Sequence, residues 1–324
     1  MQASTSTAPM HTSNNRSIVL HVLVVGLLFG LYFVLGEYHT GNLARILVLT
    51  IYAMGYNVLF GYTGLLSLGH ALFFASGMYG LGLSMQFLSF SPTTAMLMGT
   101  ICALVVAAVI GFLALRTTGV AFMIVTLMFA QAGYLTILLF GKYTRGDEGF
   151  VIQQADRIVG TFDLTQADNR FFTALVLFAL CFFFTAWLVQ TRFGKTLIAI
   201  RENEERARML GYNVQKHKLL AVVISGTLSG ISGAAYALLF GSVGATFSTV
   251  QYSILPLLWV LLGGAGTTIG PLIGTVFMFY LIDISSAYTS AYMLYAGIAL
   301  ILLTLFAPQG IAGIIRSKLL SWLP

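Results

Sequence analysis

The stretch Thr191–Lys218, TRFGKTLIAIRENEERARMLGYNVQKHK, is the most densely charged part of a very apolar chain of 324 residues. It holds seven of the sixteen Lys and Arg residues and three of the ten acidic residues. Long apolar runs lie on either side of it, Phe171–Val189 before and Leu219–Phe240 after. Because a helix needs about 20 apolar residues to cross a bilayer, this pattern predicts a charged loop between two membrane spans.

A short helix with its own start and stop signals is predicted inside this loop, at 203–211. Asn203 is a favourable N-cap, and Glu204 and Glu205 place negative charge in the first turn. Gly211 can adopt the left-handed conformation that ends a helix. Seven helical residues form a rod of about 10 Å, which is too short to be stable alone in water. We therefore expect it to pack on the protein beneath it or on a partner; a solvated loop is the alternative.

The composition excludes several classes of protein. With 58% hydrophobic and 8% charged residues, the chain lies far from soluble proteins, in which about a quarter of the residues are charged. The net charge of +6 does not indicate nucleic-acid binding, because the basic residues lie in short loops. Cys102 and Cys181 lie inside apolar runs, which favours packed thiols. No catalytic triad or metal-ligand cluster is apparent in the sequence, so an intramembrane enzyme is disfavoured and no cofactor is expected in this chain.

Apolar run length predicts an all-α polytopic membrane protein with about ten spans, of which the eighth and ninth are short. Eleven Lys and Arg residues fall on one side and favour both termini in the cytoplasm. Residues 1–17 form a polar cytoplasmic N-terminus, 18–313 a single transmembrane domain with an external loop at 141–170, and 314–324 a cytoplasmic tail. The predicted spans are Ile18–Leu35, Leu43–Phe60, Ala71–Phe90, Thr93–Leu115, Val120–Phe140, Phe171–Val189, Leu219–Phe240, Thr246–Leu262, Leu272–Ile284 and Tyr292–Phe306.

Two glycine-rich segments interrupt these spans, GYTGLLSLGHA at Gly61–Ala71 and GGAGTTIGP at Gly263–Pro271. Such glycine density lets helices approach closely, or lets a helix break where it lines a cavity. No Gly-Lys-Ser/Thr follows the second segment, so we do not expect it to bind ATP. A lone histidine at the end of a span is more typical of a structural residue than of a proton relay. The candidates for helix packing or for a pathway are Gly61, Gly64, Ser67, Gly69, His70, Thr126, Gly263, Gly264 and Gly266.

An internal match supports two halves of opposite orientation. Leu59-Phe60-Gly61-x-x-Gly64 recurs as Leu239-Phe240-Gly241-x-x-Gly244, each at the end of a predicted span. In the ten-span layout these two spans run in opposite directions, as an inverted repeat requires.

The charged loop also resembles the cytoplasmic coupling loop of bacterial ABC-importer permeases, in which a Glu-Ala-Ala-x-x-x-Gly motif docks on the ATPase subunit. Here Arg206 stands where the middle alanine would be. The Arg-Glu-Asn-Glu variant at 201–204 is similar to that of the branched-chain amino acid permeases of the LivH/LivM type, most closely the M-type subunit. The resemblance implies that the ATPase-coupling residues are Glu202, Asn203, Glu204, Glu205, Ala207 and Gly211.

Other segments carry the same resemblance. The run Ser67-Leu68-Gly69-His70-Ala71 is frequent in this family, and Val125-Thr126-Leu127 resembles its Thr-Leu pattern in the fifth span. One segment departs from the family: where it usually has Thr-Gly-Gly after the fifth span, this chain has Thr144-Arg145-Gly146. The substitution adds a positive charge near the outer mouth.

The resemblance implies a type II-like permease subunit of an ATP-driven importer in the bacterial inner membrane. Its implied partners are a second, H-type permease, two ATPase subunits that bind ATP and Mg, and a periplasmic substrate-binding protein. The pathway would lie between the two permeases, so this chain would form half of it. Branched-chain amino acids are the expected cargo, with urea, short amides or another small solute as alternatives. An ion-coupled secondary transporter or channel is the alternative class, although few ionisable residues lie within spans.

Overall fold

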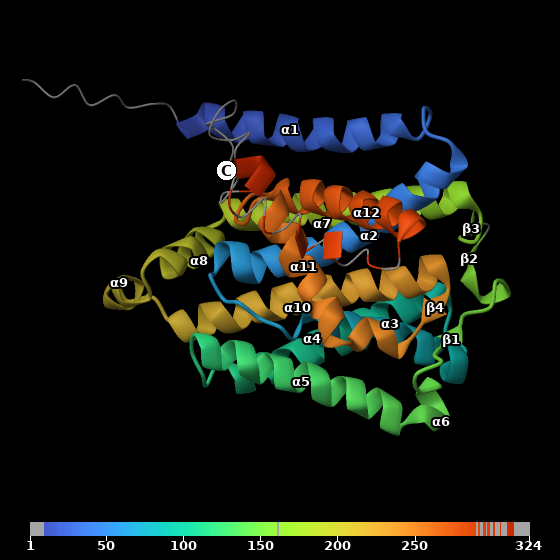
Figure 1. The fold of residues 1–324 in the computed structure, drawn as a ribbon. Helices are drawn as coiled ribbons and strands as arrows, with labels where there is room; N and C mark the ends of the chain where they lie inside the picture. The colour runs from blue at the N-terminus through green and yellow to red at the C-terminus, as the bar shows by residue number, and fades with distance from the viewer. Residues whose placement is uncertain are drawn as a thin grey trace, which may run out of the picture.

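The computed structural model describes residues 10–160 and 162–289, together with 291, 294, 295, 297, 298, 301, 305 and 310–313; for residues 10–18 it describes the backbone alone. Long helices dominate these residues and lie side by side as a bundle (Figure 1). The long helices are α1 (Met10–Leu31), α2 (Glu37–Asn57), α3 (His70–Leu88), α4 (Pro92–Ala114), α5 (Val120–Leu139), α7 (Ala167–Gln190), α10 (Val214–Phe240), α11 (Val250–Gly263) and α12 (Gly270–Tyr288).

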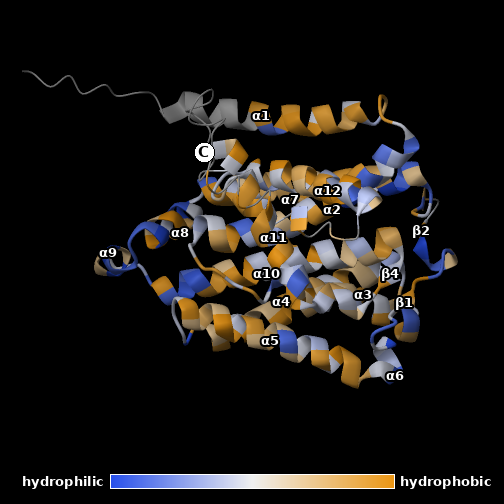
Figure 2. Ribbon diagram, in the orientation of Figure 1, coloured by the Kyte–Doolittle hydropathy of each residue, from blue (hydrophilic) through white to orange (hydrophobic). Residues whose placement is uncertain are grey.

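Within the described part of the chain, seven helices are long and apolar enough to cross a membrane: α2 with its extension to Tyr62, α3, α4, α5, α7, α10 and α12. The described apolar part of α1, Val19–Leu31, and all of α11 are apolar but shorter. Figure 2 shows hydrophobic residues along the helices and hydrophilic ones gathered at the α8–α9 end and at the opposite end. This distribution is that of a multi-pass membrane protein.

Helix α2 lies at the centre of the bundle and is buried along most of its length, packed against α7, α10, α11 and α12. Helix α10 packs in turn on α3 and α4. Glycine is required at the crossing of α3 and α10, because a Cβ atom on Gly77 would overlap the backbone of Gly230. Aromatic side chains fill the space between α2 and α3, where the ring centroids of Tyr52 and Phe74 lie 4.9 Å apart.

Nine of the ten predicted spans correspond to helices, with shifted ends. Helix α1 begins at Met10, so it includes polar residues that precede the first predicted span. The ninth span was predicted too short, since α12 continues past Ile284 to Tyr288. The eighth is a helix of only 14 residues, α11. Most of the predicted tenth span and the tail at 314–324 lie outside the described residues, as do residues 1–9.

The loop at 141–170, which the sequence predicts to be external, is folded and is not an irregular connection. It contains α6 (Gly141–Thr144), β1 (Phe150–Val151), the 3-10 turn η2 (Ala155–Arg157), β2 (Ile158–Val159) and β3 (Phe162–Asp163). Strand β1 pairs antiparallel with β4 (Ser242–Val243), which follows α10 and precedes the 3-10 turn η3 (Ala245–Ser248), and β2 pairs with β3. Helix α7 begins at Ala167, so the last four residues of this predicted loop are helical.

Two side chains hold this loop in place. Arg157 is 8% exposed, and its Nη1 donates to the carbonyl of Leu239 at 3.3 Å, so that it satisfies an open carbonyl at the end of α10. Asp163 accepts hydrogen bonds from both the hydroxyl and the amide of Thr165, at 2.7 and 2.8 Å. These two bonds lower the pKa of Asp163 because they stabilise its charged form.

The two copies of the internal match lie at opposite ends of the bundle. The first copy lies at the end of α2 near α8, and the second at the end of α10 beside β4 (Figure 1). Helices α2 and α10 therefore run in opposite directions, as the inverted repeat requires. The backbones differ, however: Gly61 lies in a π-helical turn, η1 (Val58–Tyr62), whereas Gly241 ends α10 with φ +75°.

Candidate functional site

The charged loop folds into two helices before α10 begins. Helix α8 (Arg192–Glu202) is followed by the short α9 (Glu204–Met209). The predicted N-cap is present: the Asn203 side chain accepts from the amide of Arg206 at 2.8 Å. Gly211 has φ +88° beyond the last turn, a conformation that strongly favours glycine. Sequence signals at the two ends of α9 therefore determine where it begins and ends.

Helix α9 packs on the rest of the protein through one small residue. Ala207 is 2% exposed and forms a separate apolar cluster with Ile200 of α8 and Val214 of α10. Glu204 adds polar contacts, because its carboxylate pairs with Lys218 of α10 at 2.6 Å and with Arg208 at 3.1 Å. This cluster and the Glu204–Lys218 pair fix α9 against α8 and α10.

The opposite side of α9 is uncovered. Met209 and Leu210 are 80% and 70% exposed, and Glu205 and Arg206 are exposed beside them. Two large apolar side chains at the tip of a charged loop, outside the bundle (Figure 2), form a small surface suited to packing against another protein. We call Glu205, Arg206, Met209 and Leu210 the α9 tip.

Arg201 connects this loop to the glycine-rich segments. It is the next-to-last residue of α8, and its Nη1 donates a hydrogen bond to the carbonyl of Gly61 in η1. A Cβ atom on Gly64 would lie 3.0 Å from its Cγ, and one on Gly266 would lie 2.9 Å from its Nη1. The absence of side chains at these two glycines therefore makes room for the arginine.

Asn57 joins the two glycine-rich segments to each other. Its Nδ2 donates to the carbonyl of Thr267 at 2.9 Å, and its Oδ1 accepts from the amide of Gly266 at 2.9 Å. The side chain is 3% exposed, so both hydrogen bonds are shielded from water, and breaking either would leave buried polar atoms unsatisfied at a large cost in free energy. The ends of the second and eighth predicted spans thus meet at one point beneath α8.

Two further candidates in Gly61–Ala71, Ser67 and Gly69, are buried and contact neighbouring segments. The carbonyl of Ser67 accepts from the Tyr56 hydroxyl at 3.0 Å. Thr126 of α5 accepts from the amide of Leu68 at 3.2 Å, and a Cβ atom on Gly69 would lie 2.7 Å from the Thr126 carbonyl. This segment is therefore wedged between α2 and α5.

His70 is fully buried at the start of α3. Its Nε2 lies 2.8 Å from the hydroxyl of Ser225, which donates to the carbonyl of Gly55. The ring also packs against Tyr56, with centroids 4.5 Å apart. These contacts link α2, α3 and α10, as a histidine in the predicted structural role would.

The structure brings the two groups of predicted residues together. Arg201 joins the coupling-loop candidates to Gly61, Gly64 and Gly266. Gly263 allows close packing where α11 meets α12, and Gly264 has φ +117° just beyond the end of α11. Glu202 is exposed at the end of α8. Arg201 and Asn57 were not among the predicted site residues. The signal that could have found Arg201 is its position one residue before the Glu-Asn-Glu run.

Comparison with known proteins extends this description. The family model described as "Branched-chain amino acid transport system / permease component" matches residues 38–308. A high-affinity branched-chain amino acid transport system permease protein, LivM of Escherichia coli (strain K12), is 26% identical over 84% of this chain and 69% of the relative. No solved structure matches the chain.

Two other permeases match over shorter stretches of this chain. A probable LivM of Methanocaldococcus jannaschii is 33% identical over 32% of this chain and 31% of the relative. The nucleoside ABC transporter permease protein NupC of Lactococcus lactis is 38% identical over 25% of this chain and 24% of the relative.

Proposed function

The chain belongs to the family of branched-chain amino acid transport permease components, and from this premise we propose that it forms half of the pathway of an ATP-driven importer. As a permease component it is a transport subunit, embedded in the membrane as a multi-pass protein. The other half of the pathway would come from a second, H-type permease. Two ATPase subunits and a periplasmic binding protein would complete the importer, as they do in the family that the sequence resembles.

The α9 tip is the observation that carries this proposal. ATPase subunits lie on the cytoplasmic side, so the loop that meets them must present a surface outside the bundle. Met209 and Leu210 do so: both are largely exposed, on the side of α9 that the Ala207 cluster and the Glu204–Lys218 pair leave uncovered. We assign α9 as the coupling helix, with Glu202, Asn203, Glu204, Glu205, Ala207 and Gly211 at or beneath the ATPase contact.

The path of coupling then runs through Arg201. A displacement of α9 moves α8, and Arg201 carries that movement to the carbonyl of Gly61. Because Asn57 holds Gly266 to the end of α2, the movement reaches both glycine-rich segments together. In this proposal those segments border the pathway, and the charged loop and both termini lie in the cytoplasm of a ten-span protein in the inner membrane.

Branched-chain amino acids are the proposed cargo. The matched family is described by that transport system, and LivM of Escherichia coli, matched over 84% of this chain, carries the same name. Urea, short amides and other small solutes stay as alternatives, and the match to a nucleoside permease is consistent with varied cargo among relatives. ATP hydrolysis belongs to the partner subunits in this assignment.

The experiment that tests the docking surface is co-purification of the ATPase subunits with the permeases. Replacing Met209 and Leu210 together by serine should release the ATPase subunits and abolish uptake. The matched control is Phe162→Ser, which removes an apolar side chain of 64% exposure in the external loop. If the serine pair keeps its ATPase subunits and wild-type uptake, α9 is not the docking element.

A further inference from the structure

Helix α5 is the least covered of the seven helices that are long enough to cross a membrane. Within the described residues, 17% of its apolar 18-residue stretch is buried, against 28% to 89% for the other six helices. Its buried residues are Phe122, Thr126 and Ala130, and Thr126 faces the segment before α3. Most of the surface of α5 is therefore free to contact something beyond the described residues.

One face of α5 carries a continuous stripe of exposed residues. Ile124, Met128, Gln131 and Leu135 follow one another at intervals of four, three and four residues, which places them on the same side of the helix. Met128 is 64% exposed and Leu135 is 53% exposed. Helices that pack along one another use this spacing for the residues in contact. We call these four residues the α5 stripe.

Gln131 places an amide near the middle of the membrane. It lies eight residues before Leu139, the nearer end of α5, or about 12 Å along the helix axis. Its side chain is too short to reach water from that depth, and it has no hydrogen-bond partner within the described part of the chain. Lipid chains offer no hydrogen bond, so an amide facing them would stay unsatisfied at a large cost in free energy. The amide therefore indicates a polar partner that the described residues do not supply.

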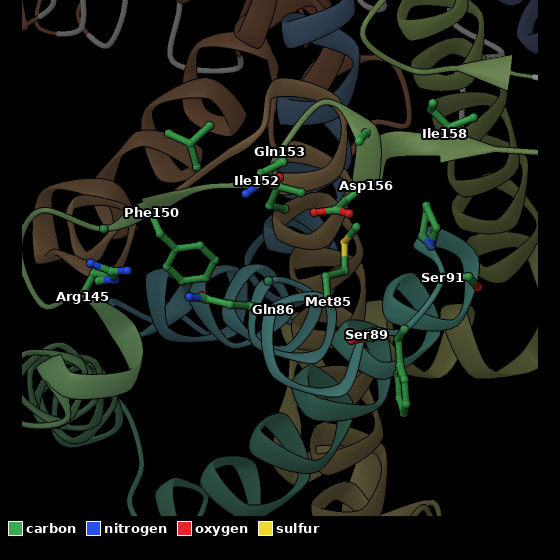
Figure 3. A pocket seen from close by; sticks show the side chains of 16 residues that line it. Met85, Gln86, Ser89, Ser91, Arg145, Phe150, Ile152, Gln153, Asp156 and Ile158 are labelled. Atoms are coloured by element: carbon green, nitrogen blue, oxygen red, sulfur yellow. The ribbon is translucent and has the colours of Figure 1, made fainter.

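Other exposed faces of the bundle do not need such a partner. Every exposed side chain at 97–112 of α4 and at 176–184 of α7 is apolar, which suits contact with lipid chains. Gln86 is exposed too, but it lies two residues before the end of α3 and lines a cavity of about 780 Å³ at the end of the bundle (Figure 3), where water can solvate its amide. Among the amide side chains of the seven helices, all of which the structure describes, Gln131 alone is both exposed and near mid-length.

We propose that the second permease packs on the α5 stripe, and that the Gln131 amide forms a hydrogen bond with a polar side chain on a helix of that partner. Amide side chains join membrane helices in this way, and a single polar residue in a helix contact also selects which helices pair. The inference rests on the proposed function for the identity of the partner. It adds the surface of contact and the kind of residue that the partner must carry.

Two other surroundings fit the α5 stripe less well. A water-filled passage would solvate the amide, but it would also expose Ile124, Met128 and Leu135 to water, which disfavours it. Lipid chains would suit these three residues but leave the amide unpaired. A helix of another protein satisfies both kinds of side chain.

The position of the contact is tested with Gln131→p-benzoylphenylalanine, a photoreactive variant, in membranes that hold the complete importer. Irradiation should cross-link this chain to the second permease. Leu180→p-benzoylphenylalanine is the matched control, because Leu180 is 64% exposed near mid-length of α7 and should give no cross-link to that permease. A cross-link from position 131 to a second copy of this chain, or to another part of the same chain, would overturn the inference.

Mass spectrometry of the wild-type complex separates this inference from the proposed function. If the second permease is present and position 131 does not cross-link to it, the inference is wrong and the proposed function stands. If no second permease is present, both are wrong. Serine replacement of Met209 and Leu210 should leave the cross-link intact, because the α9 tip is a separate surface.

The role of the amide is tested by the affinity between the two permeases in detergent. Gln131→Leu should weaken this affinity about three- to tenfold, the effect of one hydrogen bond between membrane helices, and Gln131→Asn should weaken it less because it keeps an amide. Met128→Leu, which changes the apolar packing of the α5 stripe and keeps the amide, is the control. Wild-type affinity in Gln131→Leu would contradict the hydrogen bond. Rapid labelling of Gln131→Cys by a charged thiol reagent in the assembled complex, with Cys102 and Cys181 replaced by alanine, would indicate a water-filled passage and overturn the contact.

Discussion

Replacing Arg201 by methionine tests whether the contact between α8 and the glycine-rich segments transmits coupling. Methionine keeps much of the length and apolar stem of arginine but removes its charge and its donors. The variant loses the hydrogen bond to the Gly61 carbonyl. A hydrogen bond to a charged group contributes about 1.5–3 kcal/mol, and because the Arg201 side chain is exposed we expect the lower end of that range.

A loss of about 1.4 kcal/mol is tenfold in an equilibrium constant, so uptake per ATP hydrolysed should fall about tenfold in Arg201→Met. ATPase subunits should still co-purify, since the α9 tip is unchanged. The assay measures solute uptake and ATP hydrolysis in the same proteoliposomes. Arg192→Met is the matched control, because Arg192 is an exposed arginine at the start of the same helix. Wild-type coupling in Arg201→Met would refute the assigned path.

Three further predictions concern single positions. Gly211→Val should destabilise the end of α9 by about 1–2 kcal/mol because of the positive φ alone, since a Cβ atom at this position contacts nothing. Gly211→Asn should destabilise it less, and the rate of protease cleavage in the loop measures both effects. Glu205→Lys should release the ATPase subunits and leave the melting temperature unchanged. Glu204→Lys should release them and also lower the melting temperature, because Glu204 pairs with Lys218. The same melting temperature in both variants would contradict these separate roles. Gly61→Ala should destabilise the protein by about 1–3 kcal/mol, because its Cβ would overlap the Asn57 amide oxygen, and a thermal shift near zero would count against this packing.

The sequence predicts the helices well because crossing a bilayer requires a long apolar run, which is a local property. It also predicts α9, since Asn203 and Gly211 act on the helix through the adjacent backbone. The start of α1 was missed because the polar residues after Met10 continue the helix without an apolar signal. The two-residue strands of the loop at 141–170 are too short to leave any alternating pattern.

The contacts of Arg201 and Asn57 could not be predicted for a different reason. Asn57 meets Gly266 across 209 positions of sequence, and Arg201 meets Gly61 across 140. No local pattern encodes such pairs; they exist because α2, α8 and α11 converge. Sequence reasoning did notice the charge at Arg145, but its left-handed backbone becomes visible only in the structure.

The π-helical turn at Val58–Tyr62 gives the end of α2 two possible registers. A π turn holds one residue more than an α turn, so its conversion to α geometry would rotate the chain beyond it by about 100° and shift it by about 1.5 Å. The Gly61 carbonyl would then turn away from Arg201. A change in this single turn, with no bending of the long helix, would thus be enough to make or break the contact between α8 and the end of α2.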